Sequence, residues 1–272
     1  MENKVSVIIP VYNGSKYIVE TLMSCANQTH QNLEILIIND CSTDDSKILI
    51  EKFIATDNRF HLIDNQHNLG IVGNINKGID LSTGDFIIAL GHDDILLPQH
   101  ISTMLQEIQD ADSLIYCNAD LIDGDGKVMG VQMNEQQNQR NIDERKYRFM
   151  LGNTINSCGL MFRRSFAMKV GKWTVLADFP HYGEWLFWIK LLTVGNIRYT
   201  KTIRSQYRRH QTNITNTFVD KKYQAKLFKF YLTCMKLAYE KFGNDITFEQ
   251  KIKAKIVYLK LWLKQKLLEM ST

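Results

Sequence analysis

The amino-acid sequence predicts an α/β protein with a mostly parallel, mixed sheet flanked by helices. Near-continuous apolar runs begin at Val5, Leu33, Phe60 and Asp85, at intervals of 25 to 28 residues. Segments with the apolar spacing of helices fill the intervals between these runs. Strand–helix units of this length, with strands that are apolar throughout, are typical of a parallel sheet covered on both faces.

The first two helices follow from their apolar stripes. Ile18, Leu22 and Cys25 lie three or four residues apart and form one stripe, and a second stripe runs over residues 48–54. Ser42-Thr43-Asp44-Asp45 has the form of a capping box, in which side chains bond to free backbone N–H groups at a helix start. We therefore expect the second helix to open at this box.

The second half of the chain predicts further strands and helices. Residues 132–145 are polar, rich in glutamine and asparagine, and without periodicity, which predicts a mobile loop. The Asp-Gly pairs at residues 123–126 suit a tight hairpin turn. The other expected elements are a helix from 98 to about 109, strands at 113–118, 158–162, 197–200 and 205–209, a helix near 184–194, and closing helices at 220–243 and 248–270.

The composition indicates a globular protein. The chain has 272 residues, 44% hydrophobic and 23% charged, which argues against disorder and against a coiled coil as the main architecture. Its five cysteines are scattered without a CxxC pair, which indicates a reducing compartment and no structural zinc site. The amino terminus has no signal-peptide pattern, and no apolar run is long enough to span a membrane. We expect a cytoplasmic protein.

Charge is distributed unevenly along the chain. Residues 195–272 contain 17 Lys/Arg and 5 Asp/Glu. Residues 1–194 contain 16 Lys/Arg and 24 Asp/Glu. A basic tail on an acidic body is typical of a surface that meets anions, either membrane phosphates or nucleic acid. The tail has no recognised nucleic-acid-binding motif, so we expect no nucleic-acid partner.

Candidate ligand-binding residues directly follow the strands, because ligands of such sheets bind beyond the carboxyl ends of the strands. Asp93 and Asp94 follow the fourth apolar run. Two adjacent carboxylates repel each other unless a cation lies between them, and hard oxygen ligands suit Mg²⁺ or Mn²⁺. A solvated Asp-Asp turn before the next helix explains the pair equally well.

Tyr12 and Asp40 lie at the ends of the first and second strands. A tyrosine ring can stack on a base, and a carboxylate can accept a hydrogen bond from an imide N–H such as that of uracil. The alternatives are a tyrosine at the edge of the core and a helix-capping aspartate. A dinucleotide-binding fold also places an acidic residue here, but it needs a G-x-G-x-x-G loop where this chain has PVYNGS.

Glu184, Arg208 and His210 complete the candidates. Glu184 opens an aromatic helix, where partial desolvation would raise its pKa toward that of a general base. The alternative is a first-turn glutamate favoured by the helix dipole. Arg208 and His210 end a short strand and could hold a diphosphate or, through His210, a metal. A solvated basic strand end is the alternative there.

Together these residues resemble the family 2 glycosyltransferases, a large inverting group with the GT-A (Rossmann-like) fold. The opening VSVIIPVYNGSKYIVETLMSCANQTHQNLEILIINDCSTDDS is similar to the amino-terminal signature of that family. Further matches are Asn68-x-Gly70, Asn76-x-Gly78, Ser82 to Phe86, His92-Asp93-Asp94, Arg163-Arg164-Ser165, Val170-Gly171 and Tyr207-Arg208-x-His210. We expect a catalytic domain over residues 1–215, with a nucleotide-binding half at 1–95 and an acceptor half at 96–215, and a basic helical extension at 216–272.

The resemblance implies a nucleotide-sugar donor, most often a UDP-sugar, and a saccharide acceptor. It implies that Glu184 is the catalytic base, which removes the proton from an acceptor hydroxyl as that hydroxyl attacks the anomeric carbon and inverts it. The expected ligands of Mn²⁺ or Mg²⁺ are Asp93, Asp94 and His210. The expected nucleotide-binding residues are Pro10, Tyr12, Asn13, Asp40, Asn68, Asn76, Asp93 and Arg208.

The chain departs from the family pattern at three positions. Gly91 stands where the metal motif usually begins with an aspartate, and Ile75 stands where an arginine is expected to contact a phosphate. Glu184 follows Gly183, where the family has a Glu-Asp pair, so the base is one methylene longer. These departures leave a catalytically impaired relative, which binds a nucleotide sugar or a partner, as the alternative function.

The last predicted helix is both basic and apolar. Its lysines at 251, 253, 255, 260, 264 and 266 alternate with isoleucine, valine, leucine and tryptophan. This pattern favours peripheral contact with anionic lipid at the inner face of the cytoplasmic membrane. A lipid-linked oligosaccharide of bacterial surface polysaccharide, such as O-antigen, capsule or lipopolysaccharide, is then the expected acceptor. The alternative is a helix packed on the catalytic domain.

Overall fold

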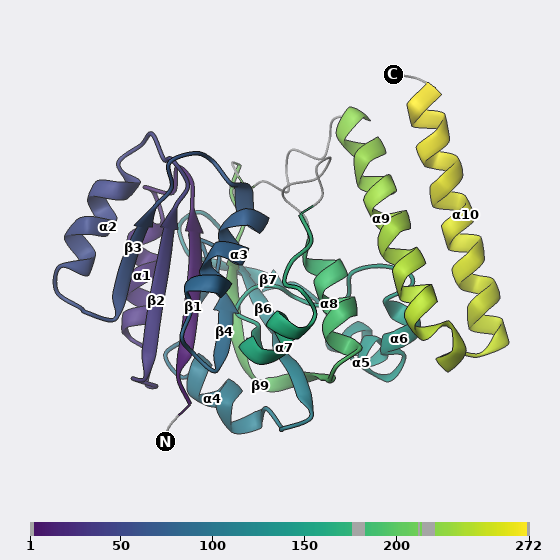
Figure 1. Cartoon of the computed structure of the whole chain (residues 1–272), viewed down its shortest axis with the longest axis horizontal. Coiled ribbons are helices and arrows are strands. Elements are labelled where there is room, and N and C mark those ends of the chain that lie inside the picture. Colours follow the sequence, from purple (N-terminus) through teal and green to yellow (C-terminus); the bar gives the residue numbers. More distant parts are fainter. Residues whose placement is uncertain (1–2, 176–182, 212, 214–220, 271–272) are drawn as a thin grey trace.

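The computed structural model describes residues 3–175, 183–211, 213 and 221–270 (Figure 1). It confirms the predicted α/β fold, with one central sheet flanked by helices. Within the described residues nine strands pair in the order β3-β2-β1-β4-β8-β6-β9-β5, and β7 pairs with β6. The strands are β1 (Val5–Val11), β2 (Leu33–Asn39), β3 (Phe60–Asp64), β4 (Phe86–Ala89), β5 (Ile95–Leu96), β6 (Asp112–Ile122), β7 (Val128–Val131), β8 (Met161–Arg163) and β9 (Asn196–Arg208). The helices are α1 (Ile18–Ala26), α2 (Ser46–Ile54), α3 (Gly70–Leu81), α4 (His100–Glu107), α5 (Glu135–Asp143), α6 (Arg145–Arg148), α7 (Arg164–Lys169), α8 (Glu184–Leu192), α9 (Lys221–Phe242) and α10 (Phe248–Met270), with a 3₁₀ turn, η2 (Gly243–Asp245).

The first half of the sheet is parallel. β1 pairs in parallel with β2 and β4, and β3 pairs in parallel with β2. Successive side chains of β1 point to opposite faces: Ile8 packs in the core beneath α3 and α8, whereas Val7 and Ile9 pack in the core beneath α1 and α4. Because these four strands run in one direction, their carboxyl ends open at a common edge.

The second half of the sheet is mixed. β8 is antiparallel to β4 and β6, and β9 runs parallel to β6. The prediction of two short strands at 197–200 and 205–209 was wrong, because β9 is continuous. Its register against β6 shifts between Cys117 and Asn118, which pair with Thr200 and Arg204. The polar residues at this shift interrupt the apolar pattern although the strand continues.

The polar segment 132–145, predicted as a loop, contains helix α5. The hydroxyl of Tyr199 in β9 donates a hydrogen bond to Oε1 of Glu135 at 3.1 Å. The amide of Asn118 in β6 donates to the carbonyl of Met133 at 2.6 Å. Polar contacts with the sheet anchor this helix, so a search for an apolar stripe misses it.

Helix α2 begins at Ser46 without the predicted capping box. Oδ1 of Asp44 accepts a hydrogen bond from the backbone N–H of Ser46 at 3.0 Å, and Oδ2 accepts from that of Ser15 at 3.0 Å. Oγ of Ser42 accepts from the backbone N–H of Asn13 at 3.1 Å. The polar run therefore ties the loop after β2 to the loop after β1.

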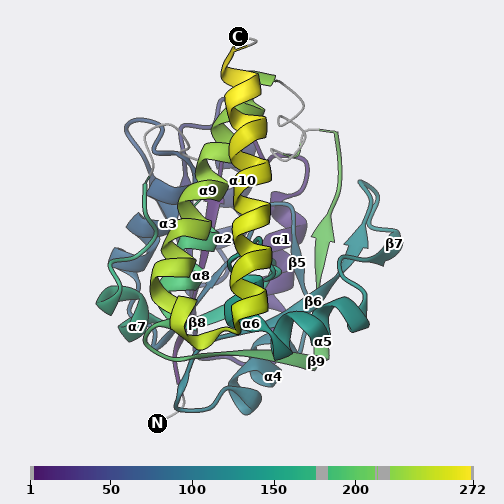
Figure 2. The same cartoon turned by 90° about the vertical axis from the view of Figure 1, so that its right-hand side faces the viewer.

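The predicted closing helices are confirmed as the antiparallel pair α9 and α10 at one end of the molecule (Figures 1 and 2). The ring of Trp185 in α8 meets that of Tyr231 in α9 edge-on, with centroids 5.5 Å apart. Cys234 and Ala238 of α9 are buried in the same core as α8. α9 is thus part of the hydrophobic core. Across the described ranges, no helix combines the length and apolarity that a membrane span requires.

Candidate active site

The loops after the parallel strands lie together at the carboxyl edge of the sheet. A methyl group added at Gly14, after β1, would contact the ring of His92, after β4. The amide of Asn65, after β3, donates a hydrogen bond to Oδ1 of Asp40, after β2, at 2.8 Å. The four loops that follow the parallel strands are therefore neighbours.

Asp40 is buried and holds the start of helix α3. Its Oδ1 accepts a hydrogen bond from the backbone N–H of Leu69 at 2.8 Å, and its Oδ2 accepts from that of Gly70 at 3.0 Å. A carboxylate has about four acceptor sites. With the bond from Asn65, the bonds above use three of them, which leaves room for an imide N–H.

Pro10, Tyr12, Asn13 and Asn68 lie on the strand end and the loops next to Asp40, whose backbone N–H donates to the carbonyl of Val11 at 2.8 Å. Tyr12 is 52% exposed at the end of β1, so its ring is accessible for stacking. Oδ1 of the exposed Asn13 accepts a hydrogen bond from the backbone N–H of Thr43 at 2.8 Å. The exposed Asn68 donates its amide to the carbonyl of Asp40 at 3.2 Å. Pro10 pairs in register with Ile38 of β2.

Asn76 lies elsewhere, on the body of α3. Its Nδ2 donates to the carbonyl of Trp173 at 2.8 Å, and its Oδ1 accepts from the backbone N–H of Trp173 at 3.0 Å. Both polar ends of this amide are thus engaged by one residue. The structure brings Asn76 to Trp173 and does not bring it to Tyr12 and Asp40.

Asp93 and His210 face each other across the site. Nε2 of His210 lies 2.9 Å from Oδ2 of Asp93, and the ring of Tyr17 lies 4.8 Å from the imidazole between ring centroids. Asn213 donates its amide to the same oxygen of Asp93 at 3.3 Å. The end of β9 is therefore joined to the acidic loop after β4.

Asp94 turns inward beside Arg208. Oδ1 of Asp94 accepts a hydrogen bond from the backbone N–H of Arg208 at 3.0 Å. Burial, together with the neighbouring charge of Asp93, raises the pKa of the Asp94 carboxyl to about 8. The guanidinium of Arg208 is 1% exposed, donates to the carbonyl of Asp93 at 2.9 Å and pairs with the carboxylate of Glu20. Arg208 thus supports the acidic loop from the interior.

The expected metal ligands are only partly assembled. Among the described residues, no group of three or more His, Cys, Asp or Glu side chains is arranged to hold a metal ion. Asp93 and His210 do converge, whereas Asp94 is directed at the backbone of Arg208. An acceptor pair of this kind fits a cation whose remaining ligands come from a substrate phosphate and water.

Two departures from the family pattern have structural explanations. A methyl group added at Gly91 would lie 2.8 Å from Oδ1 of Asp93 and 2.9 Å from Oδ2 of Asp94, so a side chain there displaces these carboxylates. Ile75 is 2% exposed and packs in the core beneath α3. Position 75 therefore serves packing in this chain.

Glu184 begins helix α8 beside the loop that precedes β8. The amide of Asn153 donates a hydrogen bond to Oε1 of Glu184 at 3.1 Å. Burial raises the pKa of the Glu184 carboxyl, while hydrogen bonds from Ser157 and Asn153 oppose that rise. The carboxyl thus has the environment expected of a general base.

Residues 153–158 connect this glutamate with the acidic loop. The side chain of Ser157 lies beside the carboxyl group of Glu184 and lowers its pKa, and that of the next residue, Cys158, does the same to Asp94. Gly183, directly before Glu184, packs close to helix α3, because a methyl group added at Gly183 would contact the side chain of Val72. Val72 lies two residues after Gly70, whose backbone N–H donates to Asp40. Short chains of contacts therefore link Glu184 to Asp94 and to the start of α3, which Asp40 holds.

The amino-acid sequence matches the profile described as glycosyl transferase family 2 over residues 6–171. The match covers more than half of the chain and includes the loops that carry Tyr12, Asp40 and Asp93. The chain belongs to glycosyl transferase family 2. It is a glycosyltransferase.

Curated bacterial relatives of this glycosyltransferase carry the same designation. The chain is 27% identical over 255 residues to an uncharacterized glycosyltransferase of Rickettsia typhi, which covers 89% of this chain and 78% of the relative. It is 31% identical over 231 residues to the putative glycosyltransferase EpsH of Bacillus subtilis, which covers 83% of this chain and 65% of the relative. The chain thus spans just under two thirds of EpsH.

Solved structures identify the fold of the glycosyltransferase as GT-A. S. aureus TarS in complex with UDP-GlcNAc superposes with a TM-score of 0.66 at 16% identity, covering 95% of this chain and 81% of TarS. The mannosyltransferase PcManGT from Pyrobaculum calidifontis, in complex with GDP-Man and Mn²⁺, superposes with a TM-score of 0.67 at 10% identity. This superposition covers 100% of this chain and 75% of PcManGT. The predicted GT-A fold is confirmed.

Sequence reasoning missed several polar residues of the glycosyltransferase site. Asn153 and Ser157 contact Glu184, Asn213 contacts Asp93, and Asn65 bonds to Asp40. Asn153 and Ser157 lie in a segment without apolar periodicity, and only the fold brings them to the base. Asn213 lies three residues after His210 and could have been suspected from that spacing, because such a side chain can bond back to the local backbone.

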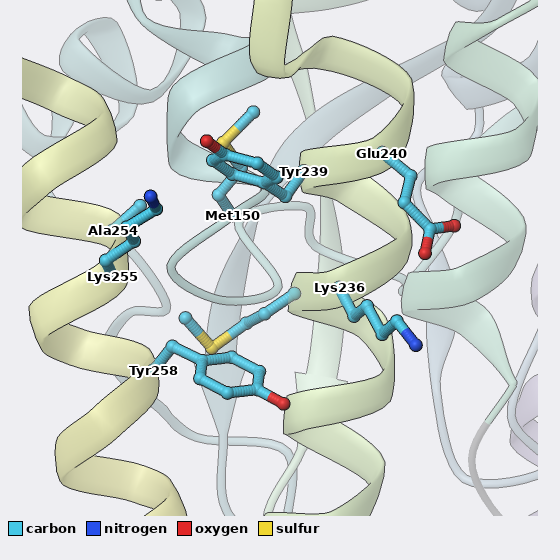
Figure 3. Close-up of a pocket in the computed structure, with 8 residues that line it drawn as sticks. Met150, Lys236, Tyr239, Glu240, Ala254, Lys255 and Tyr258 are labelled. Carbon is cyan, nitrogen blue, oxygen red and sulfur yellow. The ribbon is translucent and has the colours of Figure 1, made fainter. Parts of the chain in front are cut away.

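A separate apolar cavity of about 270 Å³ lies between α9, α10 and Met150 (Figure 3). Met235, Ala254 and Met150 are buried in its lining, and the rings of Tyr239 and Tyr258 also line it. None of its lining residues belongs to the predicted site of the glycosyltransferase. Its lining carries no carboxylate pair and no strand end, so it does not suit a nucleotide.

Proposed function

We propose that this glycosyltransferase moves a sugar from a UDP-sugar to a hydroxyl group of a lipid-linked saccharide, with inversion at the anomeric carbon. The observation that carries the proposal is Glu184. Its pKa is raised by burial, and residues 153–158 join it to the acidic loop of Asp93 and Asp94. A base and an acidic loop on either side of one region are what sugar transfer from a diphosphate requires.

The donor site of the proposal consists of Tyr12, Asn13, Asp40, Asn68 and Pro10. The exposed ring of Tyr12 offers a stacking surface for a base. The carboxylate of Asp40 retains acceptor capacity for the imide N–H of uracil. The complexes of TarS with UDP-GlcNAc and of PcManGT with GDP-Man support a nucleotide-sugar donor.

Mn²⁺ or Mg²⁺ is the proposed cofactor, and Asp93 and His210 are its proposed protein ligands. Nε2 of His210 and Oδ2 of Asp93 lie 2.9 Å apart, and both side chains are partly exposed. When bound, the cation offsets negative charge on the departing diphosphate. Asp94 contributes indirectly, because its bond to the Arg208 backbone fixes the loop that presents Asp93. The PcManGT complex with Mn²⁺ supports a divalent cation.

In the proposed reaction Glu184 removes the proton from the acceptor hydroxyl as the hydroxyl oxygen attacks the anomeric carbon. The bond between that carbon and the diphosphate breaks, and the nucleoside diphosphate departs from the opposite face. Asn153 and Ser157 hold the carboxylate in place for this step. Arg208 orders the acidic loop through its bond to the Asp93 carbonyl.

We assign the acceptor to lipid-linked oligosaccharides of bacterial surface polysaccharide, such as O-antigen, capsule or lipopolysaccharide. The protein then works in the cytoplasm at the inner face of the cytoplasmic membrane, which its C-terminal helices contact. Support comes from the basic and apolar composition of α10 and from the bacterial origin of the relatives. Residues 1–215 would form the catalytic domain, and residues 216–272 the basic extension.

Release of UDP from a panel of UDP-sugars, with water as the acceptor and with and without Mn²⁺, tests the proposed function. We expect Mn²⁺-dependent release that Asp93→Ala and Glu184→Ala each abolish. A protein that binds UDP but releases none from any donor would instead be the catalytically impaired relative. The tight fit of Gly91 against both acids argues for an adapted site over a degenerate one.

A further inference from the structure

Helix α10 has two apolar faces on opposite sides. Ala254, Val257, Tyr258 and Leu261 pack into the core that α9 shares. The opposite face carries a second set of apolar side chains that are 41 to 78% exposed. This outer face of α10 consists of Phe248, Ile252, Ile256, Leu259, Trp262, Leu263 and Leu267.

The geometry of a helix makes this outer face a continuous stripe. Because a helix turns by about 100° per residue, Ile252, Ile256, Leu259 and Leu263 project within about 60° of one another. By the same geometry, Ala254 projects on roughly the opposite side. Packing against α9 therefore leaves the stripe uncovered. Figure 2 looks directly at α10, and no other element lies in front of it.

Lysines flank the stripe on both sides. At about 100° per residue, Lys253, Lys260 and Lys264 border one side of the stripe. Lys251, Lys255 and Lys266 project on the other side of Ile252, Ile256, Leu259 and Leu263, and Trp262 lies among them there. Such lysines can keep their ammonium groups in a headgroup layer while their apolar stems follow the stripe inward.

The charge on α10 decides between an anionic surface and a second copy of the chain. The sequence of α10 contains six lysines and two glutamates. Among the described side chains, Glu249 forms an ion pair with Lys253, with 2.5 Å between Oε1 of Glu249 and Nζ of Lys253. Two copies that paired through this stripe would bring their flanking lysines together, and like charges repel. An anionic surface complements both lysine rows at once.

We propose that the outer face of α10 docks flat on a membrane surface that contains anionic phospholipid, with the apolar stripe inserted between the two lysine rows. This inference deepens the proposed function, on which it rests for the lipid-carried acceptor. It specifies the docking residues, the orientation and the lipid charge. The face opposite the membrane is the one packed on α9, so docking requires no change in the fold.

Flotation of the full chain with lipid vesicles, without any sugar nucleotide, tests the docking face. The vesicles are phosphatidylcholine alone, or phosphatidylcholine with phosphatidylglycerol. The test variant is Leu259→Glu with Leu263→Glu, whose side chains are 55% and 54% exposed. The matched control is Ile48→Glu with Met129→Glu, at 52% and 54% exposed and away from α10. A third variant changes Lys253, Lys260 and Lys264 to glutamine.

We expect the wild-type protein and the matched control to float with the anionic vesicles and not with phosphatidylcholine alone. The double glutamate variant should lose flotation, and the lysine variant should bind about fivefold more weakly for each lysine removed. Equal flotation of the wild-type protein and the double glutamate variant, or no flotation of the wild-type protein, would overturn the proposal. So would a wild-type dimer in sedimentation that the double glutamate variant converts to a monomer, since a second copy would then occupy the face.

Vesicle binding and catalysis fail independently in this design. UDP release from a donor panel requires no vesicle, so loss of docking in an active enzyme overturns only the membrane face. Docking by a protein that releases no UDP would overturn the proposed reaction and leave the membrane face standing.

Discussion

The side chains of Ser157 and Cys158, consecutive in the chain, lie beside the carboxyl groups of Glu184 and Asp94, respectively, and lower their pKa values. One peptide unit thus joins the proposed base to the acidic loop of the proposed metal site. Because the two acids depend on the same segment, their separation is fixed by the fold. The reacting hydroxyl and the departing diphosphate would lie on either side of this segment.

The pH dependence of turnover should report the environment of Glu184. A general base works as the carboxylate, and burial raises its pKa above the ordinary value of a glutamate. The rate should therefore fall, as pH decreases, at a higher pH than for an exposed glutamate. Asn153→Ala removes a bond that favours the carboxylate, so this acid limb should shift to still higher pH. The measurement is UDP release as a function of pH.

A uniform loss of rate in Asn153→Ala, with the acid limb unmoved, would mean that Asn153 only stabilises its loop. Asn68→Ala serves as a comparison, because it removes an exposed amide outside the contacts of Glu184. Its acid limb should coincide with that of the wild-type enzyme.

His210→Ala should weaken the metal response. If His210 and Asp93 are both ligands, the Mn²⁺ concentration for half-maximal activity should rise by about 10- to 100-fold. Asn213→Ala should have a smaller effect of the same sign, because Asn213 only orients Asp93. Titration of Mn²⁺ into chelator-treated enzyme measures the half-maximal Mn²⁺ concentration of each variant. An unaltered Mn²⁺ requirement in His210→Ala would remove His210 from the ligand set.

Gly91→Ala should alter metal use more than stability. The added methyl group meets side-chain oxygens, at 2.8 Å for Asp93 and 2.9 Å for Asp94, so rotation of these two side chains relieves the contact without a change in the backbone. We expect a change of less than about 1 kcal/mol in the free energy of unfolding and a higher Mn²⁺ requirement. Gly152→Ala is the control, since a methyl group there meets nothing within 4 Å. Stronger Mn²⁺ binding in the Gly91 variant would contradict this account of the departure from the family pattern.

Arg208→Ala should destabilise the fold. The guanidinium is buried, pairs with Glu20 and bonds to the carbonyl of Asp93. Its loss should lower the free energy of unfolding by about 3–5 kcal/mol. Glu20→Gln should also destabilise the fold, because it leaves the buried guanidinium of Arg208 without its carboxylate partner. Urea unfolding compares the two. Unchanged stability with lost UDP affinity would favour a direct phosphate contact by Arg208.

The sequence was sufficient to predict the parallel half of the sheet, because Val5, Leu33, Phe60 and Asp85 begin apolar runs whose period admits little else. It also located Tyr12, Asp40 and Asp93, since strand ends are readable from such runs. It failed for α5, whose anchoring contacts are polar and non-local, and for the continuous β9, where a register shift breaks the pattern.

The supporting residues of the site were beyond the reach of pattern reading. Asn153 lies 31 residues before Glu184, and only the packing of α8 on the sheet brings them together. The burial of Arg208 and the inward turn of Asp94 likewise depend on tertiary structure. The sequence of a basic strand end or of an Asp-Asp pair does not indicate which of its side chains faces the substrate.

Turnover and UDP affinity of Glu184→Gln test the central claim most directly. The substitution keeps the shape of the side chain and removes its ability to accept a proton. With the best UDP-sugar of the panel and Mn²⁺, turnover should fall by about 10²- to 10⁴-fold, while the dissociation constant for UDP stays within a factor of two. Turnover equal to that of the wild-type enzyme would contradict the assignment of Glu184 as the base.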